Sequence, residues 1–508
     1  MTAEPATDAA TEWLLPVAER RHVAGNTVTP LVHGVTYFRR LCEVVEATTA
    51  GDRIYFTDWR GDPDERLDDD GPTVADLLCS AARRGVEVRG LLWRSHTDKV
   101  SFSAQENEHL GEQINKAGGE ALLDQRVRRG GSHHQKLVVV RRRDRPEEDV
   151  AFVGGIDLSH GRRDDARHQG DPQTQPMDKR YGDRPPWHDA MVEVRGPGVC
   201  EVLETFVERW NDPTPLDHRN PYRRALQRAA DMPRHPDSLP APYDEPPASG
   251  PHTVQLLRTY AAKRPAFPFA RRGERSIARA YARAFSRATS LVYVEDQYLW
   301  SELVAGALAD ALRREPRLRA VIVVPRYPDE DGLLSGPPNR YGQLRAIELL
   351  RSAGGDRVGI YDLQNDAGTP IYVHAKVCIV DDLWMTCGSD NFNRRSWTHD
   401  SEVTCAVVDA TRDERAPADL TGRGLGARRL PRELRLALWS EHLGVPADDP
   451  RLLDPVSGQA LWDAGSGRAR SHRPRPVSRW QRWSVAPVYR MAYDPDGRPL
   501  SLRLRGGF

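Results

Sequence analysis

Apolar and polar positions follow two different periods along the first part of the chain. Short apolar runs at 53–60, 86–94 and 133–140 are typical of buried strands. Between them, 73–85 and 104–119 repeat apolar residues every three or four positions and end at glycine, as amphipathic helices do. Strands that alternate with helices favour a parallel or mixed sheet covered by helices.

The second part of the chain repeats this order. Strands are predicted at 252–260, 291–299, 318–325, 357–363 and 373–380, and helices at 275–290, 302–315 and 340–355. In each half, a histidine-x-lysine triplet follows the strand that begins at 53 or 291 by about 80 residues, enough for two strand–helix crossovers. The pattern therefore predicts an internal duplication.

The predicted fold class is α/β, with two similar lobes of mixed β-sheets flanked by helices and related by pseudo-two-fold symmetry. Sequence rich in Pro, Asp and Arg marks the join between the lobes. The predicted divisions are an N-terminal extension (1–28), a first lobe (29–210), a Pro-rich connector (211–252), a second lobe (253–445) and a Pro- and Arg-rich C-terminal segment (446–508). Little regular structure is expected in that last segment.

Composition and charge narrow the class of protein. The 508 residues are 39% hydrophobic and 29% charged, which is ordinary for a globular protein with a sizeable core. Lys and Arg together number 73, as do Asp and Glu, so the formal net charge is zero. A dedicated nucleic-acid binder usually has a basic surplus that neutralises phosphates, so no nucleic-acid partner is expected.

Other features of the sequence bear on location. No apolar run approaches the ~20 residues of a membrane-spanning helix, and the N-terminus has no basic start followed by an apolar core. The six cysteines lie in apolar contexts without a C-x-x-C pair, which favours reduced thiols and a cytoplasmic location. Any contact with a membrane is expected to be peripheral. Arg and Trp are mixed at 475–485, which suits either a membrane interface or a tail packed on the protein.

The triplets His134-x-Lys136 and His374-x-Lys376 stand at matching places in the two halves. On a strand, residues two apart point to the same face, so each triplet would present an imidazole beside an ammonium group. Two such pairs that face one another would supply a nucleophile, a general acid and two cations for a phosphate. One triplet alone is a weak signal, but its repetition predicts a site for phosphodiester chemistry.

The sequence after each triplet also suits a ligand. The next strands end in Gly-Gly at 154–155 and in Gly-Ser at 388–389, where the backbone can approach a ligand closely. Each turn is followed by a polar residue that could hold a phosphate oxygen, Asp157 in the first half and Asn391 in the second.

These residues resemble the phospholipase D superfamily, whose signature is H-x-K-x4-D followed by G-[GS]. The second half matches in full at His374, Lys376, Asp381, Gly388, Ser389 and Asn391, and the first half matches at His134, Lys136, Gly154 and Gly155. The stretches HHQK, GGIDL, PWHDAMVEVRGPG, YVEDQYL and LRLALWSEHLG are similar to the phospholipid-cleaving branch found in plants and other eukaryotes. Arg141 stands at the Asp position of the first signature, which is a departure from the pattern.

The resemblance implies a phospholipase D-like fold and cleavage of lipids such as phosphatidylcholine to phosphatidic acid, with transfer to a primary alcohol as a second outcome. It implies that His134 attacks phosphorus to form a phosphatidyl-histidine, and that His374 protonates the leaving alcohol and then activates water. Asp381 is implied to be a supporting residue. The residues expected to hold the phosphate are Lys136, Lys376, Asn391, Ser389 and Asp157.

A nucleophilic histidine also needs a carboxylate on its other ring nitrogen. In relatives this is an acidic residue on a strand just beyond the glycine turn, and Asp189 and Asp400 fit, with Glu402 as the alternative to Asp400. His133 and His188 are expected to be pocket walls or hydrogen-bond partners. No His or Cys cluster has the spacing of a zinc site, and the scheme requires no metal or other cofactor.

Three other functions are compatible with these motifs. The superfamily also contains phosphatidyltransferases of the cardiolipin synthase type, disfavoured by the absence of apolar spans, and phosphodiester nucleases, disfavoured by the zero net charge. Arg141 leaves a third alternative, an inactive lipid-binding scaffold. The expected partner is phospholipid at a membrane surface, and the chain is expected to be a monomer because two fused halves build the site without dimerisation.

Overall fold

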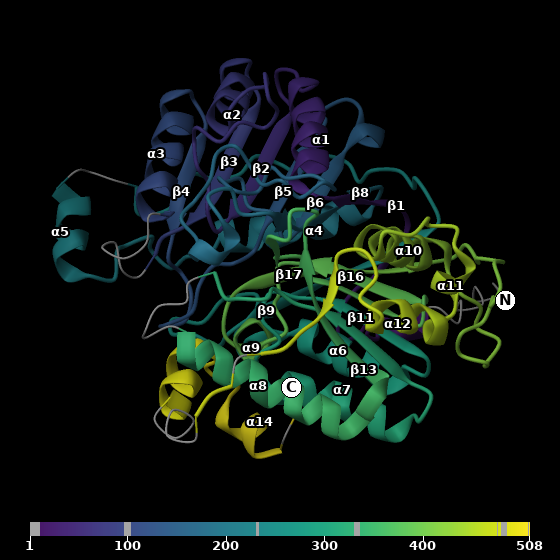
Figure 1. The fold of residues 1–508 in the computed structure, drawn as a ribbon. Helices are drawn as coiled ribbons and strands as arrows, with labels where there is room; N and C mark the ends of the chain where they lie inside the picture. The colour runs from purple at the N-terminus through teal and green to yellow at the C-terminus, as the bar shows by residue number, and fades with distance from the viewer. Residues whose placement is uncertain are drawn as a thin grey trace.

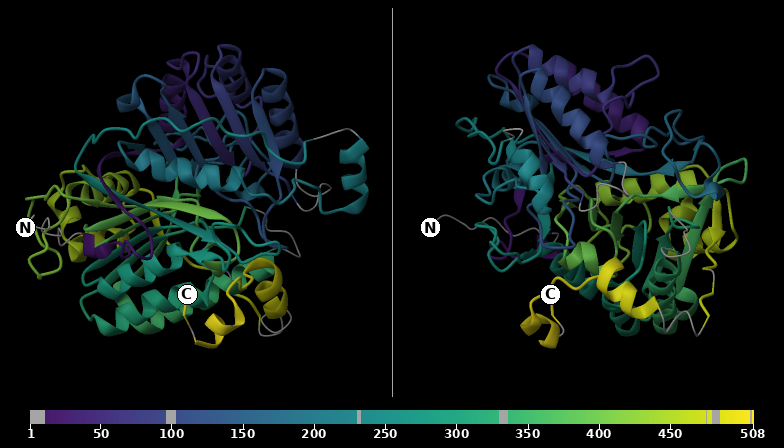
Figure 2. Two further views of the ribbon diagram at one scale, coloured as in Figure 1. Left: turned by 180° about the vertical axis from the view of Figure 1, so that it is seen from behind. Right: turned by 90° about the vertical axis from the view of Figure 1, so that its left-hand side faces the viewer.

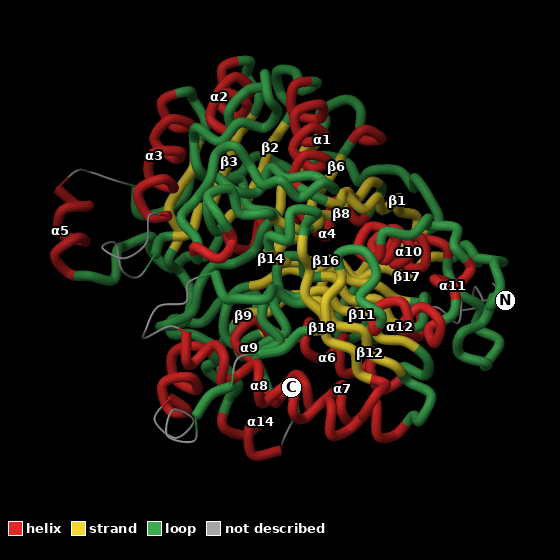
Figure 3. Tube along the Cα trace, in the orientation of Figure 1, coloured by secondary structure: helices red, strands yellow, loops and turns green. Residues whose placement is uncertain are grey.

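The computed structural model describes residues 11–95, 103–229, 233–329, 336–474, 476–478, 485–505 and 507–508. Two β-sheets lie in the middle of the molecule, with helices on their outer sides (Figure 1 and Figure 3). The fold is therefore α/β with mixed sheets, as predicted. Among the described residues, no helix combines the length and the apolar character needed to cross a membrane.

The first sheet has the strand order β1, β8, β6, β5, β2, β3 and β4. The bounds are β1 Val23–Val32, β2 Arg53–Asp58, β3 Glu87–Trp93, β4 Glu120–Asp124, β5 Leu137–Arg141, β6 Val150–Gly154 and β8 Ala190–Arg195. The strands β2, β3 and β4 are parallel and are joined through α2 (Val74–Arg83) and α3 (Ser103–Lys116), whereas the other neighbours are antiparallel.

The second sheet repeats this arrangement in the order β9, β17, β16, β15, β11, β12 and β13. The bounds are β9 His252–Tyr260, β11 Leu291–Glu295, β12 Arg319–Val323, β13 Val358–Gln364, β15 Val377–Val380, β16 Trp384–Gly388 and β17 Glu402–Asp409. Here α7 (Glu302–Arg314) and α8 (Gly336–Gly354) join the parallel strands. The edge strands β1 and β9 pair with each other, so the two sheets are joined there.

Helices cover the outer face of each sheet because their apolar positions recur every three or four residues. On the first sheet, α1 (Gly34–Glu46) buries Tyr37, Phe38 and Leu41 beside α2 and α3. On the second sheet, α6 (Ser276–Arg287), α7 and α8 form the corresponding layer. The same layers are seen from behind and from the side (Figure 2).

The inner faces of the two sheets share one hydrophobic core. Side chains from β5 and β6 of the first sheet and from β11 and β15 of the second belong to the same buried cluster. The helices α4 (Gly198–Trp210) and α10 (Arg429–Leu443) complete this cluster. The two lobes that carry the triplets are therefore packed on one common core.

Two predictions about local structure are wrong. Each histidine-x-lysine triplet lies directly before a strand and not on it, since β5 begins at Leu137 and β15 at Val377. The C-terminal segment also has regular structure, because α11 (Pro450–Leu453) and α12 (Pro455–Asp463) pack into the core and β18 (Ala469–Ser471) pairs with β13. Most of the Arg- and Trp-containing stretch at 475–485 lies outside the described residues.

The remaining elements are short. They are β7 Trp187–His188, β10 Glu274–Arg275, β14 Pro370–Val373, α5 Pro221–Ala229, α9 Arg394–Thr398 and α14 Leu500–Arg505, with single turns at Thr11–Trp13, Pro146–Glu148, Lys179–Tyr181, Gly355–Arg357 and Tyr489–Tyr493. Of these, β7 and β14 matter most for the site, because they pair in parallel between the two lobes.

Candidate active site

A cavity of about 660 Å³ lies between the two lobes. Its lining includes Trp59, His134, Asp157, Arg162 and Trp187 from the first lobe, and Gln297, Tyr372, His374, Asn391 and Glu402 from the second. The structure thus brings the histidines of both triplets to one cavity.

The His134 ring meets the second lobe. Its Nδ1 lies 2.9 Å from Oε2 of Glu402, whose side chain is 1% exposed. The same carboxylate oxygen accepts a hydrogen bond of 2.6 Å from the Ser389 hydroxyl. When Nδ1 donates to this carboxylate, Nε2 keeps its lone pair and can attack an electrophile.

The His374 ring has the reciprocal arrangement and meets the first lobe. Its Nδ1 lies 2.6 Å from Oδ2 of Asp189, which is fully buried. Asp189 also accepts from the indole N–H of Trp187 at 3.3 Å and from the backbone N–H of Ala190 at 2.9 Å. Each lobe therefore supplies a histidine to the cavity and a carboxylate to the histidine of the other lobe.

The strand register shows that the two carboxylates are equivalent. Gly154 pairs with Met191 in the first sheet, and Gly388 pairs with Thr404 in the second. Asp189 and Glu402 each stand two residues before these partners. The carboxylates are thus related by the same pseudo-symmetry as the histidines.

Gly155 allows Asp189 to lie where it does. A Cβ atom at Gly155 would be 2.2 Å from Oδ1 of Asp189, a distance that real atoms do not tolerate. Ser389 follows Gly388 as Gly155 follows Gly154, and its hydroxyl bonds Glu402. The small residue after the glycine thus adjoins the orienting carboxylate in both lobes.

The free site holds both imidazoles neutral. Burial, followed by the charges of Lys136 and Lys376, holds the pKa of His134 well below its ordinary value. Burial, followed by Lys376 and Arg162, does the same to the pKa of His374. A bound phosphate adds negative charge, which favours protonation of an imidazole.

The Lys136 ammonium group is held by an ion pair. It is 1% exposed, lies 3.1 Å from Oδ1 of Asp157 and donates to the carbonyl of His134 at 3.3 Å. Arg162 lies 3.6 Å from the other oxygen of Asp157. Although burial opposes the shift, Lys136 and Arg162 hold the pKa of Asp157 below its ordinary value.

This ion pair corrects the prediction that Asp157 holds a phosphate oxygen. An ionised carboxylate has no proton to donate and repels an anion. Asp157 instead positions Lys136 and Arg162, which are the groups that can attract a phosphate.

The Lys376 ammonium group is also buried, and it contacts the carbonyl of His374 and Oε1 of Gln297. Burial lowers the pKa of Lys376 to about 8, with Lys136 adding to the shift and Asp189 opposing it. Lys376 is therefore a cation below about pH 8 in the free site.

The two polar residues after the second triplet differ in what they can do. Ser389 is fully buried and uses its hydroxyl proton on Glu402, while its oxygen accepts from the N–H of Val403. This corrects the prediction that Ser389 holds the phosphate, because its one proton is already donated. Asn391 lines the cavity, and its Oδ1 has no hydrogen-bond partner among the described residues.

Asp400 lines the cavity but does not contact His134. Its carboxylate accepts from the N–H of Ser132 at 2.9 Å and from Nε of Arg395 at 2.6 Å. Glu402, the alternative to Asp400, is the carboxylate that bonds the His134 ring.

Asp381 bonds backbone N–H groups and does not line the cavity. Its two carboxylate oxygens accept from the N–H groups of Thr289, Ser290 and Leu291, which ties the end of β15 to the start of β11. The side chain is fully buried. Asp381 therefore supports the strand that follows the second triplet.

In the first lobe, other residues tie together the two strands that correspond to β15 and β11. Arg141, at the position equivalent to Asp381, pairs with Asp149 at 2.5 Å. Asp52 accepts from the N–H groups of Thr49 and Arg143, and so ties the start of β2 to the end of β5. In the first lobe the carboxylate that ties the two strands together therefore comes from Asp52, directly before β2, and not from the position of the signature Asp.

Sequence reasoning missed Arg162 and Gln297 as site residues. Arg162 lies over the ring of Trp187 at 3.9 Å from its centroid, and Gln297 donates to the hydroxyl of Tyr372 at 2.7 Å. Gln297 belongs to YVEDQYL, which carries the family resemblance, and Arg162 comes four residues after GGIDL, so only Gln297 lay within a stretch that the resemblance marked.

Two family models match the chain. The one described as "Phospholipase D" matches residues 62–303, and the one described as "Cardiolipin synthase, PLD-like domain" matches residues 281–416. The first match contains His134, and the second contains His374.

Named relatives match most of the chain. "Phospholipase D A" of Dictyostelium discoideum is 26% identical over 477 residues, which is 80% of this chain and 35% of that protein. "Phospholipase D alpha 2" of Oryza sativa subsp. japonica is 26% identical over 565 residues, 84% of this chain and 66% of that protein. "Phospholipase D alpha 2" of Arabidopsis thaliana is 27% identical, over 89% of this chain and 71% of that protein. The chain thus spans about a third of the length of the first of these relatives and about two thirds of the second.

A solved structure also matches. It is titled "Crystal structure of phosphatidylserine synthase Haemophilus influenzae Rd KW20", with a TM-score of 0.49, 15% sequence identity, and coverage of 75% of this chain and 82% of that chain.

Proposed function

This chain belongs to the phospholipase D superfamily, and from that premise we propose that it is a phospholipase D. The proposed reaction is hydrolysis of the head-group phosphodiester of glycerophospholipids such as phosphatidylcholine, which gives phosphatidic acid and the free alcohol. The observation that supports it most is the pair of imidazoles at one cavity, each with a buried carboxylate on Nδ1.

In the proposed first step, Nε2 of neutral His134 attacks phosphorus. His374, protonated in the substrate complex, gives its Nε2 proton to the departing head-group oxygen. A P–N bond forms as the P–O bond to the head group breaks, which leaves a phosphatidyl-histidine and the free alcohol. Glu402 stabilises the positive charge that the His134 ring gains, and Lys136 and Lys376 stabilise the phosphate.

In the proposed second step, water replaces the head group. His374 is neutral after the first step, so it can take a proton from water as the water oxygen attacks phosphorus. The P–N bond breaks, phosphatidic acid leaves, and His134 is restored with its lone pair. A primary alcohol in place of water gives a phosphatidyl alcohol by the same route.

Aromatic side chains support a phospholipid as the substrate. Trp59, Trp93, Trp187, Tyr298 and Trp300 all line the cavity. Aromatic faces attract quaternary ammonium groups such as that of choline, and they also offer apolar surface to the glycerol backbone. We further propose a monomer in the cytoplasm that contacts membranes peripherally; the described residues form no disulfide, and one chain contributes both triplets.

The test is phosphorus NMR of mixed micelles of phosphatidylcholine and phosphatidylethanolamine with purified protein and ethanol, recorded both with and without chelator. Wild type should give phosphatidic acid and phosphatidylethanol, and His134→Ala should give neither. An unchanged spectrum with wild type would overturn the proposal.

The alternatives give different results in matched assays. Conversion of phosphatidylglycerol to cardiolipin would indicate a phosphatidyltransferase, and cleavage of single-stranded DNA would indicate a nuclease. Lipid binding without turnover would indicate a scaffold, and Arg141→Asp would then be the variant to examine.

A further inference from the structure

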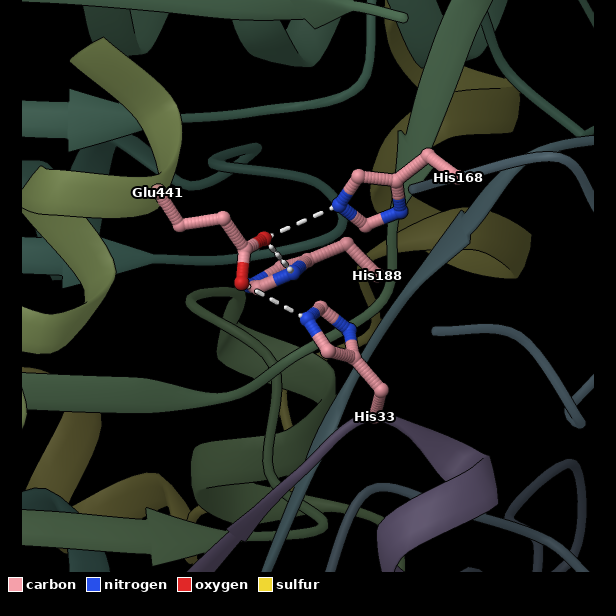
Figure 4. A group of neighbouring side chains, drawn as sticks. All are labelled: His33, His168, His188 and Glu441. Atoms are coloured by element: carbon pink, nitrogen blue, oxygen red, sulfur yellow. Dashed lines mark hydrogen bonds and ion pairs between the residues drawn. The ribbon is translucent and has the colours of Figure 1, made fainter. Parts of the chain in front are cut away.

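A second cluster of histidines lies outside the lining of the catalytic cavity. Figure 4 shows His33, His168 and His188 turned towards the carboxylate of Glu441. The four side chains come from four different segments, with His33 just before α1, His168 in a loop, His188 on β7 and Glu441 on α10. The three histidines are at most 5% exposed, and the Glu441 side chain is 16% exposed.

The spacing of the ligand atoms suits one metal ion. The Nε2 atoms of His33 and His168 lie 2.8 Å and 3.0 Å from the Glu441 oxygens, and Nδ1 of His188 lies 3.8 Å from one of them. All four ligand atoms lie within 4.8 Å of one another. Ligands at the usual Zn–N and Zn–O distances in a tetrahedron are about 3.4 Å apart, so these values bracket that spacing.

Hydrogen bonds on the far sides of two rings leave the nitrogen that faces the cluster free to bind a cation when the ring is neutral. Nδ1 of His168 lies 3.0 Å from the carbonyl of Trp187, which can only accept. Nε2 of His188 lies 2.8 Å from the Glu295 carboxylate. A neutral ring that donates on one nitrogen has its lone pair on the other, and histidine ligands of metals are usually held in this way.

A network of hydrogen bonds among these side chains does not account for Nδ1 of His188. Nδ1 of His188 is buried and has no hydrogen-bond partner among the described residues, although it faces the cluster. The His188 ring is fully buried. A buried polar atom without a partner costs free energy, and a bound cation would remove that cost.

We propose that His33, His168, His188 and Glu441 bind one zinc ion. Three imidazoles and a carboxylate are a ligand set that zinc accepts, whereas Mg²⁺ and Ca²⁺ prefer oxygen ligands throughout. Four protein ligands leave no open position, as in zinc sites with a structural role. The proposed zinc site is separate from the cavity where the phosphodiester is cleaved. The proposed cleavage mechanism uses no metal.

The position of this site gives it a consequence for the catalytic cavity. The carbonyl of His188 accepts the backbone N–H of His374 at 2.8 Å, and the next residue, Asp189, orients the His374 ring. The backbone N–H of His33 donates to the carbonyl of Asp189 at 2.9 Å. An ion at the site would join α10 of the second lobe to the segment of the first lobe that positions His374.

The first test is elemental analysis of the full chain, purified without a metal-affinity tag or chelator. We expect about one zinc per chain in wild type and in His472→Ala, and about a tenth of that in His33→Ala and His168→Ala. His472 is the matched control because it is buried and its ring contacts Asp362 and Gln343, which are not part of the cluster. Cobalt added after removal of zinc should give the visible bands of a four-coordinate ion in wild type and in the control.

The second test uses a variant that keeps the shape of the cluster, in case the alanine variants do not fold. Glu441→Gln should bind cobalt at least about tenfold more weakly than wild type in a spectroscopic titration. Zinc should raise the thermal midpoint of wild type more than that of Glu441→Gln. Equal cobalt affinity in wild type and Glu441→Gln would overturn the proposal. It would also be overturned if wild type were purified without zinc and gave no cobalt bands. Equal zinc content in the alanine variants and in His472→Ala would overturn it as well.

Discussion

Replacing Glu402 with glutamine removes the carboxylate charge beside His134 and keeps the size of the side chain. Oε2 of Glu402 lies 2.9 Å from Nδ1 of His134, and the Glu402 side chain is 1% exposed. As His134 attacks phosphorus, its ring gains a positive charge. Two unit charges about 4 Å apart at an effective dielectric constant of about 20 interact by about 4 kcal/mol. Since about 1.4 kcal/mol changes a rate tenfold, we expect kcat to fall about 10³-fold.

The assay is choline release from phosphatidylcholine micelles at pH 8, with Asp400→Asn as the matched control. Asp400 lines the same cavity but bonds Ser132 and Arg395, so we expect Asp400→Asn to reduce kcat less than about tenfold. KM should change little in Glu402→Gln, because the lost interaction strengthens only as charge develops on the ring. Circular dichroism checks that both variants are folded.

The two variants together can refute the reasoning. If Asp400→Asn loses as much activity as Glu402→Gln, then the contact of Glu402 with His134 does not set the two carboxylates apart, and the assignment of Glu402 fails. If Glu402→Gln keeps its activity within about tenfold, the Glu402 charge beside Nδ1 of His134 lowers the activation free energy by less than about 1.4 kcal/mol.

Further predictions concern pH and two buried contacts. Burial raises the pKa of Glu402 to about 8 and lowers that of Lys376 to about 8. Glu402 must be ionised and Lys376 must be charged, so kcat/KM should be greatest near pH 8 and fall on both sides. Lys376→Arg should move the fall on the alkaline side to higher pH. A profile that is flat across this range would contradict the prediction. Gly155→Ala puts a methyl group 2.2 Å from the unshifted Oδ1 of Asp189 and should lower kcat at least about tenfold in a folded protein, whereas unchanged turnover would exclude the clash. Asp149→Asn leaves the buried Arg141 without its ion pair, so urea denaturation should show about 3 kcal/mol less stability; an unchanged midpoint would contradict this.

Periodicity predicted the alternation of strands and helices because each crossover buries one apolar face. It did not predict β4 (Glu120–Asp124), whose apolar run is only three residues long, Ala121–Leu123, between two acidic residues. It also placed the triplets on strands, because the valines after His134 continue the apolar pattern. In the structure the triplet residues precede the strand, where each histidine backbone bonds the other lobe.

The roles of individual site residues depended on contacts that the sequence does not show. Asp400 lies just before β17 and Glu402 is its first residue, and only the pairing of Gly388 with Thr404 fixes which one reaches His134. Asp157 follows its glycine turn as Asn391 does, yet a charge and an amide act differently beside Lys136.

The proposed zinc ligands could not be found by looking for zinc-site motifs in the sequence. His33, His168, His188 and Glu441 come from four segments that only the folded chain brings together. Zinc-site motifs are recognised in sequences by pairs of ligands a few residues apart, and no two of these four have such a spacing.

The most direct test of the proposed chemistry is to trap the covalent intermediate in His374→Ala with a phosphatidyl 4-nitrophenyl ester. The nitrophenolate needs no proton to leave, so the first step can proceed without His374, whereas attack by water loses its base. We expect release of about one nitrophenolate per chain, followed by a stop, with the phosphatidyl group found on His134 by peptide mass spectrometry. An adduct on any other residue, or steady turnover without an adduct, would contradict attack by His134.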